Sequence, residues 1–359
     1  MQMQTKKANK QIGVVAGILE QNNQYLLCQR PKGKICENFW EFPGGKIEPN
    51  ETPLDAICRE LSEELKITIN RQKTYFWFCK DFVYPHAAVK LHFFRISQWQ
   101  GEITLENAEH QALSWQSKEF LQPTVSPLLP ANFEIIKALV LPEIALICEN
   151  SADKIIAFLE NLKNQQNQQN QKNQKILIIF REKSTKIFGE KIRKLQDFYQ
   201  QLQRLNLLEN IIFSINISNE QDLQLFSQIP QNFSISAHLS SDFFINHQNS
   251  LPEIKQKYSL LWLGVSTHTA EDLAKIKEIN QRQNQNQTII DYAFLSPIFQ
   301  TKTHPEISAE ATLGIKNFKN LVKNFATTPI FALGGLSLQK DLENIKTAGG
   351  HGIATISGI

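Results

Sequence analysis

Eight short apolar runs, separated by polar segments with helical periodicity, occupy most of the chain from residue 145 onward. The runs are 145–148, 175–180, 211–215, 234–239, 260–265, 289–295, 329–333 and 352–356. Continuous apolar runs of this length are typical of strands that are buried on both faces of a parallel sheet. Eight such strands alternating with helical connections predict a parallel (β/α)8 barrel. The last run lies at the end of the sequence, so the pattern leaves almost no room for an eighth helix.

Two tracts rich in glutamine and asparagine interrupt the barrel pattern, at 164–174 and 281–287. Such tracts carry too little apolar surface to be buried in a core. We therefore expect loop or helix-end expansions that face solvent. A glutamine-rich interaction motif is the alternative interpretation.

The first 140 residues or so lack this alternation. Strand-like runs of β-branched, aromatic and alternating polar residues occupy 13–19, 25–29, 74–80 and 89–96, and a last helical segment covers 132–139. Pro142 then marks a boundary. Since 359 residues exceed the size at which a single core usually stops growing, we predict two domains, 1–140 and 141–359.

Charge and cysteine content exclude several classes of protein. The chain has 38 Lys and Arg against 35 Asp and Glu, a net charge of only +3 with no basic stripe. We therefore expect neither a nucleic-acid polymer nor a membrane as partner, and no apolar run is long enough to span a bilayer. Five cysteines without a C-x-x-C pair indicate a reducing compartment rather than disulfides or zinc. We expect a cytoplasmic protein and leave its oligomeric state open.

A helix with three closely spaced glutamates is predicted within the segment 45–67 (GKIEPNETPLDAICRELSEELKI). Thr52 followed by proline is typical of a helix start. The apolar positions then recur at helical spacing, at Leu54, Ile57, Cys58, Leu61 and Leu65. These positions predict which face of the helix is buried.

The three glutamates, Glu60, Glu63 and Glu64, are spaced i, i+3 and i+4, so they project from one patch. Hard oxygen ligands grouped in this way suit Mg²⁺ or Mn²⁺, particularly when substrate phosphates complete the shell. The turn at Gly44 lets the backbone approach the same patch, and Arg59 adds a cation. A solvated acidic helix face is the alternative.

This segment resembles the signature of Nudix hydrolases. The matching residues are Gly45, Glu51, Arg59, Glu60, Leu61, Glu63, Glu64 and Ile67. Lys66 replaces the glycine that ends the helix in the family. Over about residues 8–139 the chain looks most similar to the MutT (8-oxo-dGTP diphosphatase) type, which implies an α/β fold with a mixed sheet and flanking helices.

The resemblance also implies roles for individual residues. It implies a metal held by the Gly44 carbonyl and by Glu60, Glu63 and Glu64, with Arg59 beside them and with Glu64 or Glu63 helping to activate water. Glu51 is expected to brace the loop and helix rather than bind the metal. The implied substrate contacts are Arg30, Glu41, Phe42, Pro43, Gly44, Lys46 and Asn132.

Asn132 is the residue that would read the purine, because an amide offers a donor and an acceptor together. An N-cap for the last helix is its alternative role. Two positions differ from the MutT pattern. His86, Ala87 and Ala88 stand where the family has an arginine, and Ser114 stands where an acidic residue precedes the tryptophan. Glu109 is a candidate to replace that acid.

Three glycine- or hydroxyl-rich segments follow predicted barrel strands, where barrels of the TIM type place their sites. They are 296–304, 333–336 and 354–358, and their backbone N–H groups and hydroxyls suit a phosphate. These segments and GVSTH at 264–268 resemble the thiamine-phosphate synthase and TenI superfamily. The resemblance implies phosphate contacts from Arg181, Lys183, Thr301, Thr303, Gly335 and Ser357, with His268 near the thiazole.

The barrel departs from the synthases at two places. Asn216-Ile217-Ser218 lacks a magnesium-binding aspartate, and Asp242 is one place early. Without those carboxylates the expulsion of pyrophosphate has poor support. We expect a barrel that binds a phosphate or a thiazole- or thiamine-type ligand. His110, His247, His304 and His351 are scattered along the chain and are predicted to be structural or surface residues.

The predicted function is Mg²⁺-dependent hydrolysis of oxidised purine nucleoside triphosphates, 8-oxo-dGTP first, to the monophosphate and pyrophosphate. Two alternatives remain. One is a hydrolase or synthase that acts in thiamine metabolism. The other is a barrel that serves only as a non-catalytic, ligand-binding regulatory module.

Overall fold

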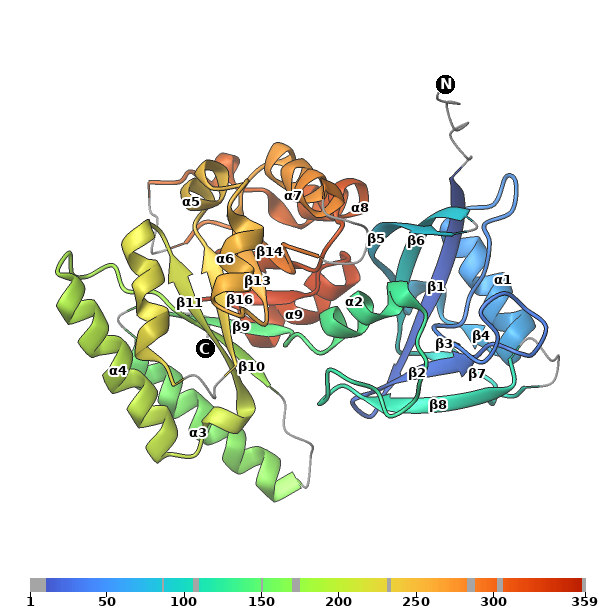
Figure 1. Ribbon diagram of the computed structural model, residues 1–359, viewed down its shortest axis with the longest axis horizontal. Helices are drawn as coiled ribbons and strands as arrows, with labels where there is room; N and C mark the ends of the chain where they lie inside the picture. Colours follow the sequence, from blue (N-terminus) through green and yellow to red (C-terminus); the bar gives the residue numbers. More distant parts are fainter. Residues whose placement is uncertain are drawn as a thin grey trace, which may run out of the picture. The chain divides into compact units, whose positions relative to one another are not determined.

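A computed structural model describes residues 11–85, 87–105, 110–149, 151–169, 175–230, 234–282, 288–301 and 306–356. The chain forms two compact units, the first made mainly of residues up to Val140 and the second mainly of residues from Leu141 onward. Their elements can be followed in Figure 1, from blue to green in the first unit and from green to red in the second.

The first unit is built on a mixed sheet with the strand order β3-β2-β1-β6-β5, and β8 pairs with the free edge of β2. The central pair, β1 and β6, is parallel, and the other pairings are antiparallel. The strands are β1 (Ile12–Gln21), β2 (Gln24–Gln29), β3 (Trp40–Glu41), β5 (Thr74–Tyr84), β6 (Ala87–Ile96) and β8 (Ala112–Ser117). A separate two-stranded sheet joins β4 (Thr68–Ile69) to β7 (Trp99–Gln100). The expected mixed sheet is confirmed.

Helix α1 (Pro53–Leu65) carries the glutamates, and its start is as predicted. The Thr52 side chain accepts a hydrogen bond from the Asp55 amide, which caps the helix. Ile57, Leu61 and Leu65 are fully buried in a core that includes β1. Burying each of these side chains contributes about 1.5–3 kcal/mol. This packing fixes the rotation of the helix about its axis and so determines where the glutamates point.

Helix α1 ends at a lysine, where the resemblance to Nudix hydrolases implies a glycine. Lys66 is the C-cap residue and adopts a left-handed conformation, with φ of 60° and ψ of 27°. Its N–H donates to the Leu61 carbonyl, so the helix ends in the usual geometry although a lysine occupies the position. The first unit also contains a 3-10 helix, Arg71–Lys73, and a last helix, α2 (Pro130–Leu139).

The second unit is a closed eight-stranded barrel in which every neighbouring pair is parallel. All eight predicted runs contain a strand, and β16 pairs with β9 to close the barrel. The strands are β9 (Ile144–Cys148), β10 (Ile176–Phe180), β11 (Ile211–Ile217), β12 (Ile235–Leu239), β13 (Leu263–Thr267), β14 (Tyr292–Leu295), β15 (Ile330–Leu333) and β16 (Gly352–Thr355). The predicted barrel of the TIM type is confirmed.

The barrel's crossovers are helical but not uniform. The α-helices are α3 (Ala152–Gln169), α4 (Phe188–Arg204), α5 (Ser241–Asn246), α6 (Leu251–Lys257), α7 (Ala270–Arg282), α8 (Gly314–Phe325) and α9 (Leu338–Thr347). Short 3-10 helices occupy Leu208–Asn210, Glu220–Gln228 and Ala309–Ala311, and the second of these replaces an α-helix between β11 and β12.

The two polar tracts coincide with helix ends. The first extends α3 to Gln169, and the second begins at the last turn of α7. Residues 170–174 and 283–287 of these tracts lie outside the described residues. In the described part of the chain, no helix has the length and apolar character needed to cross a bilayer. All five cysteines are free thiols.

Candidate active site

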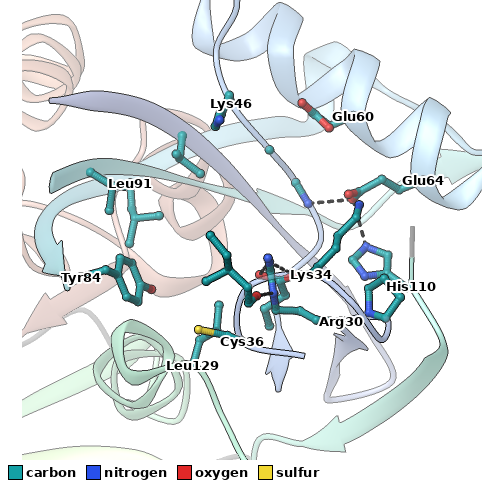
Figure 2. Close-up of a pocket in the computed structure, with 17 residues that line it drawn as sticks. Arg30, Lys34, Cys36, Lys46, Glu60, Glu64, Tyr84, Leu91, His110 and Leu129 are labelled. Atoms are coloured by element: carbon teal, nitrogen blue, oxygen red, sulfur yellow. Dashed lines mark hydrogen bonds and ion pairs between the residues drawn. The ribbon is translucent and has the colours of Figure 1, made fainter. Parts of the chain in front are cut away.

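A cavity of about 540 Å³ lies in the first unit, over the turn that precedes α1. Figure 2 shows that its two ends differ in chemistry. Glu60, Glu64 and His110 line one side, whereas Tyr84, Leu91 and Leu129 line the other. Arg30, Lys34, Glu41, Gly44, Gly45 and Lys46 are also among its lining residues. An acidic end joined to an apolar end suits a ligand that is polar at one end and has a ring at the other.

The turn 43–45 brings backbone and carboxylates together because its glycines lack side chains. The Val15 amide donates to the Gly45 carbonyl and the Gly17 amide to the Pro43 carbonyl, both at 2.8 Å. Gly44 has φ of 142°, and a Cβ there would lie 2.2 Å from the Val15 carbonyl oxygen. The turn is therefore bound directly to β1, and any larger residue at Gly44 would push it away.

Arg59 is the centre of the ion-pair network on α1. Its Nε and Nη2 donate to the two carboxylate oxygens of Glu51, both at 2.9 Å. Its Nη1 donates to Glu60 at 2.9 Å and to Glu63 at 3.2 Å. Glu51 also accepts from the Glu48 amide at 3.0 Å, as expected for a residue that braces the loop. The arginine thus joins the loop before the helix to two of the three glutamates.

Burial and mutual repulsion destabilise the ionised form of the carboxylates at the acidic end of the cavity. Burial raises the pKa of Glu60, and the charges of Glu64 and Glu63 add to that effect, although Arg59 opposes it. Burial likewise raises the pKa of Glu41, against the opposing charge of Arg30. Because carboxylates crowded in this way are destabilised as anions, they favour the arrival of a cation.

The ligand chemistry of this end fits a hard divalent cation. The carboxylates of Glu60 and Glu64 and the carbonyl of Gly44 are oxygen ligands, and all three residues line the cavity. Glu63 is not among the lining residues, and 58% of its side chain is exposed. Within the described ranges, no three His, Cys, Asp or Glu side chains lie close enough to hold a metal by themselves. The carboxylates of Glu60 and Glu64 suit Mg²⁺, which usually keeps several waters and binds one or two carboxylates together with substrate phosphates.

His110 is a cavity residue that was predicted to be structural or on the surface. It is only 5% exposed, and its Nε2 lies 3.2 Å from Oε2 of Glu64. The amide of Gly44 donates to the same oxygen at 2.9 Å. The sequence offered little signal for this contact, because a single histidine outside the segment 45–67 has no diagnostic spacing.

The expected substrate contacts fall into two groups. Arg30, Glu41, Gly44 and Lys46 line the cavity. Arg30 is held in place, since its Nη1 donates to both oxygens of Glu41 at 2.7 and 2.8 Å and its Nε donates to the Ile35 carbonyl. The buried residues Phe42, Pro43 and Asn132 do not line it.

The alternative role of Asn132, an N-cap, is wrong. The N-cap of α2 is Leu129, and Asn132 lies inside the first turn. Its Nδ2 donates to the Trp40 carbonyl at 3.4 Å, and the residue is 6% exposed. Its side chain therefore links the helix to β3. His86, which differs from the MutT pattern, and Glu109, the candidate to replace its acidic residue, lie outside the described residues.

In the barrel, two predicted phosphate contacts follow β10. Arg181 forms an ion pair with Glu149, which follows β9, and Lys183 is exposed. Thr301 is half-buried, whereas Thr303 and Ser357 lie outside the described residues. Gly335 has φ of 67°, and a Cβ there would lie 2.6 Å from the Gln300 carbonyl oxygen. This glycine is thus required by close packing of two loops.

The structure also describes the barrel residues that stand where the synthases have carboxylates. Ile217 is fully buried, and Asn216 donates to the Ser218 hydroxyl at 2.8 Å. Asp242 is exposed in the first turn of α5. His268 contacts the Ser296 carbonyl through Nδ1 at 3.0 Å. None of these residues restores a carboxylate at the end of β11.

Comparison with known proteins matches each unit to a different family. A family model described as NUDIX domain matches residues 9–139, and one described as thiamine monophosphate synthase matches residues 245–359. A CTP pyrophosphohydrolase of Escherichia coli (strain K12) is 36% identical over 135 residues, which cover 36% of this chain and 91% of the relative.

Two 8-oxo-dGTP diphosphatases are similar to the same part of the chain. The protein of Proteus vulgaris is 38% identical over 96 residues, covering 26% of this chain and 84% of the relative. The protein of Escherichia coli (strain K12) is 34% identical over 132 residues, covering 36% of this chain and 97% of the relative. These relatives match the unit that contains the cavity.

Proposed function

Since its first unit makes this chain a member of the Nudix family of pyrophosphate-bond hydrolases, we propose that it is a Mg²⁺-dependent enzyme that cleaves oxidised purine nucleoside triphosphates, 8-oxo-dGTP first. Water would break the bond between the α- and β-phosphates and leave 8-oxo-dGMP and pyrophosphate. The observation that carries this proposal is the cavity, in which a group of carboxylates and an apolar wall lie at opposite ends.

The acidic end would hold the metal through Glu60, Glu64 and the Gly44 carbonyl, with Glu63 close by on the same helix. When bound, the ion would neutralise phosphate charge and lower the pKa of the attacking water. Arg59 holds Glu60 toward the turn and keeps it from rotating into solvent. Glu64 or Glu63 would orient the water and accept its proton.

The cations of the cavity would bind the phosphates. Arg30 and Lys46 both line it, and Arg30 is pre-positioned by its two bonds to Glu41. Pre-positioning lowers the conformational entropy that the arginine side chain loses when a phosphate binds. The base would lie against Tyr84, Leu91 and Leu129, and Asn132 would contact its edge after giving up the bond to Trp40.

A direct test compares four substrates under Mg²⁺: 8-oxo-dGTP, dGTP, CTP and thiamine diphosphate, with products separated by chromatography. We expect 8-oxo-dGMP and pyrophosphate, and we expect EDTA to stop the reaction until Mg²⁺ is returned. Glu64→Gln should lower kcat by at least about 100-fold because it removes a ligand and a proton acceptor. Glu102→Gln, an exposed residue outside the cavity, is the matched control.

The outcomes of this test separate the alternatives. CTP as the preferred substrate would move the specificity toward that of the E. coli relative named above. Turnover confined to thiamine diphosphate would overturn the purine assignment and place both units in thiamine metabolism. Turnover of a purine triphosphate should depend on Asn132 but not on Arg181 or Lys183.

For the barrel we propose binding of a phosphorylated, thiazole- or thiamine-type ligand. The supporting observation is that Arg181 and Glu149 follow adjacent strands at the C-terminal ends of the barrel. Titration calorimetry with thiazole phosphate should give binding that Arg181→Met weakens by about 10-fold or more. Formation of thiamine phosphate would make the barrel a synthase. Binding without turnover would favour a regulatory module.

A further inference from the structure

His110 lies in a segment that the sheet holds firmly. Its neighbour Gln111 donates through its amide to the Gln29 carbonyl at 2.9 Å, and through its side chain to Asn38 at 2.7 Å. The strand β8 begins directly afterwards and pairs with β2. The backbone next to His110 is therefore anchored to the sheet, independently of the helix that carries the glutamates.

The ring and the turn converge on one oxygen of Glu64. His110 Nε2 lies 3.2 Å from Oε2, and the Gly44 amide nitrogen lies 2.9 Å from the same atom (Figure 2). Both side chains are buried, at 2% exposure for His110 and 10% for Glu64. Two groups on separate segments thus contact the same oxygen, which limits rotation of the carboxylate.

The surroundings of the two ring nitrogens indicate which one carries the hydrogen. Both nitrogens of His110 are buried, and neither forms a hydrogen bond of good geometry among the described residues. A buried N–H without an acceptor costs about 1–3 kcal/mol, and Nε2 has the carboxylate oxygen of Glu64 at 3.2 Å, so the hydrogen is better placed on Nε2. That hydrogen then lies toward Glu64.

We propose that His110 is a positioning residue for the reaction, in that its Nε2–H and the Gly44 amide together hold Oε2 of Glu64 so that the carboxylate presents its other oxygen to the metal. The predicted effect on the reaction rate rests on the proposed hydrolysis, whereas the predicted effect on metal binding does not. Groups of this kind, which orient a metal ligand from behind, change metal affinity or activity by about 10–100-fold when they are removed.

The test measures Mn²⁺ binding to the full chain without nucleotide, by the electron paramagnetic resonance signal of free Mn²⁺. We expect His110→Leu to weaken binding by about 10-fold, and His110→Gln, which keeps an N–H at a similar reach, to restore most of it. In steady-state kinetics, the Mg²⁺ concentration for half-maximal rate should rise in the same proportion. KM for the nucleotide at saturating Mg²⁺ should stay close to that of the wild type.

His92→Leu is the matched control, because His92 lies in the same unit but does not line the cavity. It should leave Mn²⁺ affinity unchanged. If His110→Leu does not fold, a comparison of His110→Gln with His110→Asn still tests the proposal. The glutamine amide is long enough to reach Glu64, whereas the asparagine amide is not. Equal Mn²⁺ affinity in those two variants, or a wild-type affinity in His110→Leu, would overturn the proposal.

Failure of the His110 proposal can be distinguished from failure of the proposed function. A wild-type chain that binds Mn²⁺ but hydrolyses none of the triphosphates would contradict the proposed substrate class and leave the His110 result standing. Hydrolysis of the triphosphates by the wild type, together with unchanged Mn²⁺ affinity in His110→Leu, would support the proposed function and contradict the role of His110.

Discussion

Gly45 and Glu60 lie so close that a Cβ on the glycine would be 2.4 Å from Oε1 of the glutamate. The residue before the helix and the carboxylate on it therefore depend on each other. Only a residue without a side chain allows the Glu60 carboxylate to lie against the turn, where Arg59 Nη1 donates to it. The spacing between the glycine and the glutamates in the sequence thus has a steric cause.

Gly45→Ala should therefore displace the Glu60 carboxylate. We expect the affinity for Mn²⁺ and kcat with Mg²⁺ to fall by about 10–100-fold, while the circular dichroism spectrum stays that of the wild type. Gly189→Ala is the control, since a Cβ at that position meets nothing within 4 Å. Unchanged metal affinity in Gly45→Ala would show that Glu60 is not held in this position when it binds metal.

Arg59→Lys should test the bridging role of the guanidinium. A lysine keeps the charge but cannot bond Glu51 through two nitrogens and Glu60 through a third. We expect a loss of about 1–2 kcal/mol in unfolding free energy and a higher Mg²⁺ requirement, measured by urea unfolding and by rate against Mg²⁺ concentration.

Arg71→Lys is the matched control for that variant. Arg71 pairs with Asp55, but both side chains are about half exposed, and such pairs contribute little. A loss equal to that of Arg59→Lys would contradict the special role of Arg59.

Lys66→Gly should stabilise the first unit. Lys66 occupies a left-handed conformation, which glycine adopts without steric cost. We expect an increase of about 0.5–1 kcal/mol in unfolding free energy, and a decrease in Lys66→Val, because β-branched residues tolerate this conformation least. Tryptophan fluorescence during urea unfolding would measure both. A destabilised Lys66→Gly variant would mean that the lysine side chain contributes more than the strain costs.

The barrel should lose stability as the pH falls below neutral, because of His238. Burial, together with the charge of Arg181, lowers the pKa of His238 to about 3, compared with about 6.5 in an unfolded chain. Between these values the unfolded chain binds the proton and the folded barrel does not. Stability therefore falls with decreasing pH, by up to about 1.4 kcal/mol per pH unit from this residue.

The measurement is urea unfolding at about pH 7.5 and about pH 5.5, followed by circular dichroism. His238→Gln, which cannot titrate, should lose less stability between the two values than the wild type. An equal loss in both proteins would show that other groups determine the pH dependence.

Local sequence determined a large part of this protein. The apolar positions of α1 follow its helical period, and Thr52 caps the helix where a hydroxyl residue before proline predicts it. The eight apolar runs predict the barrel because each is long enough to cross it once and is followed by a connection that returns the chain. Such signals depend on neighbours within about one or two turns, so they can be recognised without knowing the fold.

Elements that depend on distant partners were not predicted. The strands β3, β4 and β7 have two residues each, too few for any periodicity, and they exist because another strand pairs with them. Residues 112–117, which form β8, combine two large apolar residues with small and polar ones, and their pairing partner is β2. Strand formation here follows from hydrogen bonding across the sheet rather than from local preference.

The site divides in the same way. The glutamates, Arg59 and the glycine turn are close in the sequence, and the sequence by itself determined that one helix would present carboxylates to one turn. Only the tertiary structure decided that His110 meets Glu64 and that Asn132 is bonded to Trp40. The physical reason is that these contacts depend on the register of β8 against β2 and on the packing of α2, which involve residues far apart in the chain.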